Sequence, residues 1–154
     1  MRVIEFLDKE AVHYELSEHP PTFTAQEMAA VEHEPGRFVA KPVIVKAGDE
    51  HLMCVLPACC KIDLGRLKDQ IGADSVELAD EAEIGRMFDD CELGAEPPFG
   101  NLYNMQTVMD RALEEDDHIK FQAGSHAKSL SMKMDDYRRL AEPKVLEFSY
   151  HTTS

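Results

Sequence analysis

Apolar residues recur along the chain with helix-like and strand-like spacing, and this spacing divides it into short elements. Residues 2–10 place four apolar side chains on one stripe, which predicts an N-terminal helix. Residues 12–16 alternate enough to predict a short strand. Two apolar runs at 38–46 and 51–56 flank the turn Ala47-Gly48-Asp49-Glu50, and this pattern predicts a β-hairpin. Because Pro42 has no backbone N–H, it indicates an edge or end position in the first strand.

The other elements follow from capping residues and short apolar runs. Thr24-Ala25-Gln26-Glu27 has the pattern of a capping box and predicts a short helix after it. Asp63 and Gly72 fit the start and the stop of a second helix. A helix over 80–88 has an acidic first turn, and a last short helix starts at Asp135 or Asp136. Further strands are predicted at 75–78, 107–109, 119–122, 129–132 and 144–148.

Strands therefore outnumber helices, and tight turns join several neighbours. This arrangement favours a mixed α/β (α+β) fold with a largely antiparallel sheet and helices packed on it, rather than an alternating βαβ fold. The chain has 154 residues and no internal repeat or low-complexity linker, so we expect one domain over residues 1–154.

Composition limits where the protein works. No apolar run approaches the ~20 residues of a membrane helix, and the charged N-terminal segment lacks the apolar core of a signal peptide. We therefore expect no membrane association and a cytoplasmic location. The four cysteines lack the density of a secreted disulfide scaffold, which is consistent with reduced thiols.

Charge and missing motifs limit the chemistry. The 16 basic residues stand against 30 acidic ones, so the net charge of −14 argues against a general nucleic-acid coat protein and against DNA binding. The chain contains no G-x-G-x-x-G, P-loop or G-x-S-x-G motif, so dinucleotide, P-loop and α/β-hydrolase chemistry have no support. The histidines form no pair at ligand spacing, so we expect neither a metal site nor a cofactor.

Three short segments could carry chemistry, and each has a plain structural alternative. Lys41 lies among apolar strand residues and could point an ammonium into a concave face, or extend it into solvent. The loop Gly94–Gly100 could offer backbone N–H groups to an oxyanion or a carbonyl, or simply connect two elements. The segment Phe121–His126 presents a hydroxyl and an imidazole after a strand, or forms a hairpin turn.

In this order and at this spacing, the segments resemble the YbaK/ProX-type domain of bacterial aminoacyl-tRNA deacylases. These enzymes edit mischarged tRNA as free-standing proteins or within prolyl-tRNA synthetase. The resemblance runs from about residue 19 to about residue 148, and the family fold is a curved, mostly antiparallel sheet surrounded by helices. The matching segments are His19–Glu27, Pro35–Arg37, Ala40-Lys41, Val55–Ala58, Gly94–Gly100 and Phe121–His126.

The resemblance also implies the residues of a site. The family's strand lysine corresponds to Lys41, its Gly-Pro loop to Gly94–Gly100, and its Ala-Gly segment to Ala123-Gly124. The catalytic residues that it implies are Lys41, Gly94, Gly100 and His126. The substrate-binding residues that it implies are Pro97, Pro98, Phe99, Ala123, Gly124 and Ser125. Many members carry Thr or Asn directly after the lysine, whereas Pro42 supplies no hydroxyl, amide or backbone donor there.

The implied activity is trans-editing: hydrolysis of the ester between a small amino acid (Ala, Ser or Cys) and the 3′ acceptor end of tRNAPro or a similar tRNA. Such an ester is already activated, so a positioned water and a stabilised oxyanion suffice. A synthetase is a second expected partner. Because an acidic chain repels tRNA phosphates, we expect steeply salt-sensitive activity. The alternative is a non-catalytic module that binds a small ligand or accompanies a synthetase.

Overall fold

The computed structural model describes residues 2–21 and 39–151. The elements of the first half are α1 (Arg2–Lys9), β1 (Tyr14–Glu18), β2 (Ala40–Ala47), β3 (Glu50–Pro57), β4 (Cys60–Ile62), α3 (Leu64–Ile71), β5 (Val76–Leu78) and α4 (Glu81–Met87). Those of the second half are η2 (Gly100–Tyr103), β6 (Gln106–Asp110), η3 (Arg111–Glu115), β7 (His118–Gln122), β8 (Lys128–Lys133), α5 (Met134–Ala141), β9 (Lys144–Leu146) and β10 (Ser149–His151). The predicted capping box lies outside the described residues.

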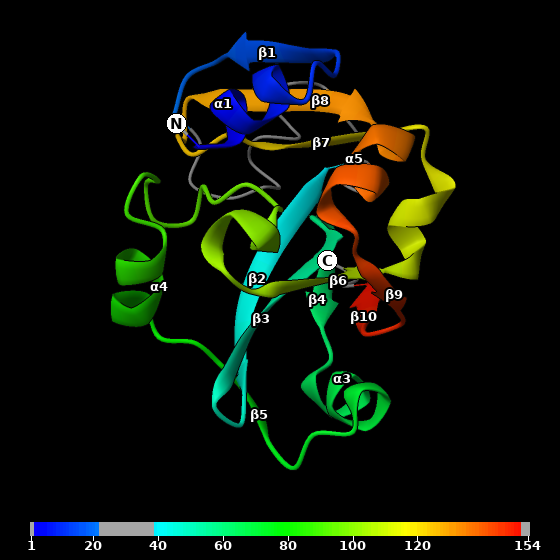
Figure 1. Cartoon of the computed structure of the whole chain (residues 1–154). Helices are drawn as coiled ribbons and strands as arrows, with labels where there is room; N and C mark the ends of the chain where they lie inside the picture. Colours follow the sequence, from blue (N-terminus) through cyan, green and yellow to red (C-terminus); the bar gives the residue numbers. More distant parts are fainter. Residues whose placement is uncertain (1, 22–38, 152–154) are drawn as a thin grey trace.

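The strands of the described residues form three sheets. The longest has the order β5-β2-β3-β6-β9, antiparallel from β5 to β3 and parallel from β3 to β9. The second, β1-β8-β7, is antiparallel, and Figure 1 shows it lying crosswise over one end of the first. A parallel bridge between Val39 and Lys120 joins the two sheets, and β4 pairs separately with β10. The prediction of a mixed, mostly antiparallel fold is confirmed, although the strands divide among sheets.

Alternation along β2 separates two hydrophobic cores. Ala40 and Ile44 belong to the larger core, which α1, α5 and the crosswise sheet enclose. Val45 belongs to the smaller core beside α3, and Val43 packs against it. Since successive strand residues point to opposite faces, Pro42 shares a face with Ala40, and position 41 shares the other face with Val43.

Local signals place the helices as predicted. The Asp63 carboxylate accepts a hydrogen bond from the Arg66 N–H, and Gly72 ends α3 in the left-handed conformation with φ 69°. The Asp80 carboxylate caps α4 in the same way. In the described part of the chain, no helix is long and apolar enough to cross a membrane.

Pro42 lies where the sequence predicts. Strand β5 pairs only with the Val45–Ala47 end of β2, so among the described strands β2 has a neighbour on one side only at Pro42, where it faces Val55 of β3. Proline is tolerated at such an open edge because its missing N–H removes no hydrogen bond from the ladder there.

Candidate active site

Backbone hydrogen bonds bring the Gly-Pro loop against the turn between β7 and β8. The Gly124 N–H donates to the Ala95 carbonyl at 2.8 Å, and the Glu92 N–H donates to the Gly124 carbonyl at 2.9 Å. Gly124 has φ 85°, a conformation that favours glycine. Two of the three segments singled out in the sequence thus meet in space, and we call this contact the loop–turn junction (residues 92–100 and 123–126).

His126 fastens the junction with both its backbone and its ring. Its N–H donates to the Glu92 carboxylate at 2.9 Å, and its Nε2 lies 2.7 Å from the Leu93 carbonyl oxygen. A carbonyl only accepts, so Nε2 carries the proton and Nδ1 is the basic nitrogen of the neutral ring. Nδ1, the ring nitrogen left to act as a base, is buried in this geometry.

The N–H groups of both predicted glycines are already bonded within the chain. The Gly94 N–H donates to the Glu96 carboxylate at 3.0 Å, and the Gly100 N–H donates to the Thr107 hydroxyl at 2.9 Å. In this geometry neither group is available to a substrate carbonyl, which corrects the expectation from the sequence. Two donors of the loop stabilise its own shape instead.

Position 100 requires glycine because there is no room for a side chain. A Cβ at this position would lie 2.7 Å from both the Met105 carbonyl oxygen and the Thr107 hydroxyl. We therefore expect Gly100→Ala to lower the free energy of unfolding by about 1–3 kcal/mol, the usual cost of overpacking. Urea denaturation measures it. The matched control is Gly85→Ala, where a Cβ meets nothing within 4 Å in the interior of α4 and is expected to stabilise by about 0.5–1 kcal/mol. Equal effects of both substitutions would contradict this role.

Phe99 is a core residue, and this corrects its predicted contact with substrate. Its side chain has no exposed surface. Its ring lies edge-on to Phe6, Phe121 and Tyr137, with centroids 5.8, 5.9 and 5.1 Å away. The Tyr137 hydroxyl donates to the Pro98 carbonyl at 2.6 Å, and both Pro97 and Pro98 are buried. The prolines and Phe99 therefore anchor the loop to the core.

Ala123 and Ser125 shape the turn on the other side of the junction. The Ala123 N–H donates to the Lys128 carbonyl, and the Lys128 N–H donates to the Ser125 carbonyl. The Ser125 hydroxyl accepts from the Ala127 N–H at 3.1 Å. The segment is thus a hairpin turn between β7 and β8, which is one of the two interpretations that the sequence allowed. Ser125 still lies at the junction.

Lys41 stands apart from these residues. Its half-buried side chain shares the face of β2 with Val43, and burial lowers the pKa of its ammonium. The thiols of Cys60 and Cys59 partly oppose this change. None of the interactions described for residues 2–21 and 39–151 joins Lys41 to the junction. Instead Pro42 points to the same side as the core residues of the loop.

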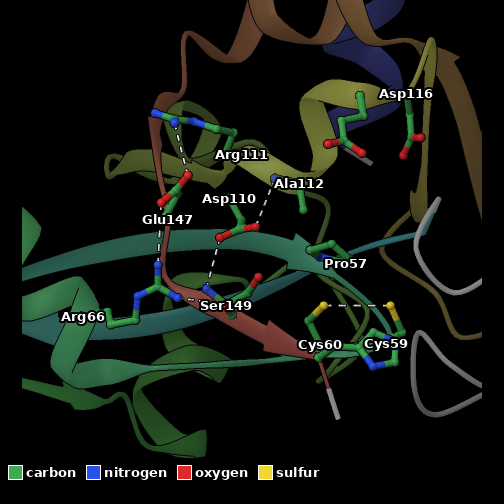
Figure 2. Close-up of a pocket in the computed structure, with 12 residues that line it drawn as sticks. Pro57, Cys59, Cys60, Arg66, Asp110, Arg111, Ala112, Asp116, Glu147 and Ser149 are labelled. Carbon is green, nitrogen blue, oxygen red and sulfur yellow. Dashed lines mark hydrogen bonds and ion pairs between the residues drawn. The ribbon is translucent and has the colours of Figure 1, made fainter. Parts of the chain in front are cut away.

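A cavity of about 730 Å³ opens beside the cysteine turn, and none of the predicted site residues lines it. Four separate segments contribute to it: the β3–β4 turn, α3, η3 with the end of β6, and the β9–β10 end (Figure 2). At its centre the buried Asp110 carboxylate accepts from the N–H groups of Phe148, Ser149 and Ala112. Sequence reasoning missed this cavity because only tertiary packing brings its segments together.

Metal chemistry has no support from the described side chains. Among residues 2–21 and 39–151, no three His, Cys, Asp or Glu residues gather closely enough to hold an ion. The four cysteines are free thiols.

Comparison with known proteins decides the family. The sequence model described as the aminoacyl-tRNA editing domain matches residues 19–140. The chain belongs to this family. The multifunctional Ser/Thr-tRNA deacylase ProXp-y of Escherichia coli (strain K12) is 29% identical over 152 residues, covering 96% of this chain and 90% of that protein. The prolyl-tRNA editing protein ProX of Acetoanaerobium sticklandii is 25% identical over 146 residues, covering 91% and 88%. The family predicted from the motifs is confirmed.

Solved structures confirm the editing-domain fold. The hypothetical protein APE2540 superimposes with a TM-score of 0.87 at 21% identity, covering 97% of this chain and all of that one (100%). A candidate trans-editing enzyme for prolyl tRNA synthetase superimposes with a TM-score of 0.85 at 18% identity, covering 97% and 95%. At such identities the likeness concerns the fold alone.

Proposed function

We propose that this protein is a trans-editing deacylase, which hydrolyses the ester between a wrong amino acid and the 3′-terminal adenosine of a tRNA. Membership in the editing family carries the proposal, and two observations support it. The curated relatives, which match nearly their whole length, are named as a tRNA deacylase and a prolyl-tRNA editing protein. The loop and the turn that the family resemblance singles out also meet in one junction.

We propose a small amino acid as the group removed. A synthetase pocket discriminates against one missing methylene by only ~1–3 kcal/mol, so a second, hydrolytic pocket has to remove small intruders. Alanine, serine and cysteine on tRNAPro or a similar tRNA fit this role. The E. coli relative is named for Ser and Thr, so threonine belongs among the amino acids tested.

The residues of the proposed site have different tasks. The ammonium of Lys41 would bind a phosphate or the ribose at the tRNA end as a point charge. His126 would hold the loop in place through the bond from its Nε2–H to the Leu93 carbonyl. Ser125, with a half-buried hydroxyl at the junction, is a candidate contact to the substrate. No step requires a metal, so activity is expected to persist in chelator.

A deacylation assay on a panel of mischarged tRNAs tests the function. Seryl-, threonyl-, alanyl- and cysteinyl-tRNAs are compared with the cognate prolyl-tRNAPro, each with and without the protein. We expect rapid release of at least one small amino acid and no release of proline beyond the uncatalysed rate. If the folded protein turns over no ester of the panel, the deacylase proposal is wrong and a non-catalytic binding module takes its place.

A further inference from the structure

The turn between β3 and β4 places two thiols in contact. Cys59 lies in the turn, and Cys60 begins β4. Their sulfur atoms are 3.8 Å apart, and Figure 2 shows them facing each other at the wall of the cavity described above. Neighbouring residues of a regular strand point to opposite faces, so the turn is what brings both sulfurs to one side.

The two thiols differ in exposure. Cys60 is 8% exposed and belongs to the smaller core, whereas Cys59 is partly exposed. Both line the cavity of about 730 Å³, which gives a small molecule access to the pair. An accessible thiol beside a second one is the arrangement in which the first sulfur is oxidised and the second resolves it to a disulfide.

Backbone pairing holds the turn from both ends. The Ala58 N–H donates to the Val39 carbonyl at 2.7 Å, which ties the turn to the residue before β2. Cys60 pairs with His151 across β4 and β10. The folded chain therefore keeps the two sulfurs together, and a reaction between groups that are already positioned has a smaller entropic barrier.

The surroundings of Cys60 suit the thiol that reacts second. Burial and the neighbouring Cys59 thiol raise the pKa of Cys60 to about 11, although its hydrogen bond with the Ser149 hydroxyl acts in the opposite direction. The thiolate is the nucleophile toward an oxidant, so a thiol that stays protonated near neutral pH is not the first to be oxidised. The more exposed Cys59 is therefore assigned the first step.

The pair has the geometry of a reactive dithiol. We propose that Cys59 and Cys60 form a modification site, which reduces a small peroxide and closes to a disulfide between adjacent residues. The Cys59 sulfur attacks one peroxide oxygen and becomes a sulfenic acid, while the other oxygen takes the thiol proton and leaves as water or an alcohol. The Cys60 sulfur then attacks the Cys59 sulfur, and its proton leaves with the hydroxyl group as a second water. Two thiols are oxidised for one peroxide reduced, and the inference does not depend on the proposed function.

The disulfide formed here is expected to be easily reduced. Consecutive Cα atoms are about 3.8 Å apart, which is less than the about 4.4–6.8 Å that disulfides usually span. Closure between adjacent residues therefore costs strain, and strained disulfides are the labile ones. A dithiol reductant should thus return both cysteines to the thiol form, which makes the modification reversible.

Treatment of the folded protein with hydrogen peroxide, followed by thiol titration in denaturant, tests the inference. The wild type should lose two of its four thiols, and dithiothreitol should restore both. The tryptic peptide 47–61 contains Cys54, Cys59 and Cys60, so its fragment masses show which residues have lost two hydrogens. We expect that loss within Cys59-Cys60. Four surviving thiols, a disulfide that includes Cys54 or Cys91, or a link between two chains would overturn the inference.

Serine variants separate the two steps. Cys60→Ser lacks the second thiol, so Cys59 should stop at the sulfenic acid, which dimedone labels, and the disulfide should not form. The matched control is Cys91→Ser, which removes a partly exposed thiol that contacts Asp90 and Tyr103 in another part of the fold. It should still lose two thiols to peroxide. Loss of two thiols from Cys60→Ser as well would show that another pair reacts.

Phenylarsine oxide gives a second measurement, which needs no oxidant. Its arsenic(III) is a soft centre that forms two As–S bonds with a close dithiol and releases its oxygen as water. The reduced wild type and Cys91→Ser should each bind one arsenic per chain and lose two titratable thiols. Cys60→Ser should bind far more weakly, because one As–S bond lacks the chelate. A folded wild type that binds no arsenic would contradict the inference whether or not the variants fold.

Discussion

Replacement of Lys41 by alanine is expected to lower kcat/KM for the best aminoacyl-tRNA by about 10- to 100-fold, because a hydrogen bond between charged groups, such as the one proposed to a phosphate, is worth about 1.5–3 kcal/mol. The reason lies in the burial of the ammonium. Half-buried beside two thiols, Lys41 bears a desolvation cost that lowers its pKa, and such a cost is typical of a charge placed for function. Single-turnover deacylation with saturating enzyme measures the decrease, and thermal unfolding checks that the variant is folded.

Lys41→Arg is the matched control, because it keeps the positive charge. It should retain more activity than the alanine variant if the charge is what matters. The ammonium form is present only below the pKa of Lys41, and burial moves that pKa downward. As the pH rises, the wild-type activity that depends on Lys41 should therefore begin to decline before the pH reaches the ordinary lysine pKa of about 10.4. The arginine variant should show no such decline. Full activity of Lys41→Ala would remove Lys41 from the mechanism.

Phe99→Ala is expected to lower the free energy of unfolding by about 3–5 kcal/mol, which is the range for deleting a large buried aromatic side chain. Phe99 has no exposed surface and contacts rings from α1, β7 and α5, so its removal leaves a cavity that three elements border. Urea denaturation followed by circular dichroism gives the difference directly.

Two comparisons sharpen this second prediction. Phe99→Leu keeps most of the volume and should cost clearly less than Phe99→Ala. Tyr150→Ala removes an aromatic ring that is 49% exposed and should change stability by no more than about 0.5 kcal/mol. A Phe99→Ala variant as stable as the wild type would show that the loop is anchored by other contacts, such as the bond from Tyr137 to Pro98.

The two predictions separate the roles of the two parts of the site. Lys41→Ala is expected to lower activity without lowering stability, whereas Phe99→Ala is expected to lower the free energy of unfolding. The loop–turn junction is held by backbone hydrogen bonds and by the buried ring of Phe99, whereas Lys41, the proposed phosphate contact, lies on β2. This division follows from the alternation along β2, which sends neighbouring residues to opposite faces.

Elements whose signals are local could be predicted from the sequence. The caps at Asp63 and Asp80 and the stop at Gly72 depend on hydrogen bonds that span three or four residues. The open edge at Pro42 follows from the missing N–H of proline. The order of weak motifs also sufficed to identify the family, since each motif keeps its place on the same scaffold.

The three-residue strands β4 and β10 could not be predicted in this way. Each is too short to show a period, and they exist only because they pair with each other, Cys60 opposite His151. The cavity depends on that pairing and on the contact of α3 with the β9–β10 end through Arg66, Gln70 and Glu147. These contacts cross about half of the chain, where periodicity carries no information.

The loop Gly94–Gly100 shows most clearly which features the sequence predicts and which depend on tertiary contacts. Its glycines and prolines specify a stiff, close-packed connection, because their backbone freedom and rigidity are intrinsic to those residues. Whether its N–H groups face a substrate depends on partners elsewhere: Thr107 on β6 takes the Gly100 donor, and the aromatic rings of three elements enclose Phe99. Local conformation is set by each residue's own chemistry, whereas hydrogen-bond partners and burial are set by distant residues that only folding brings together.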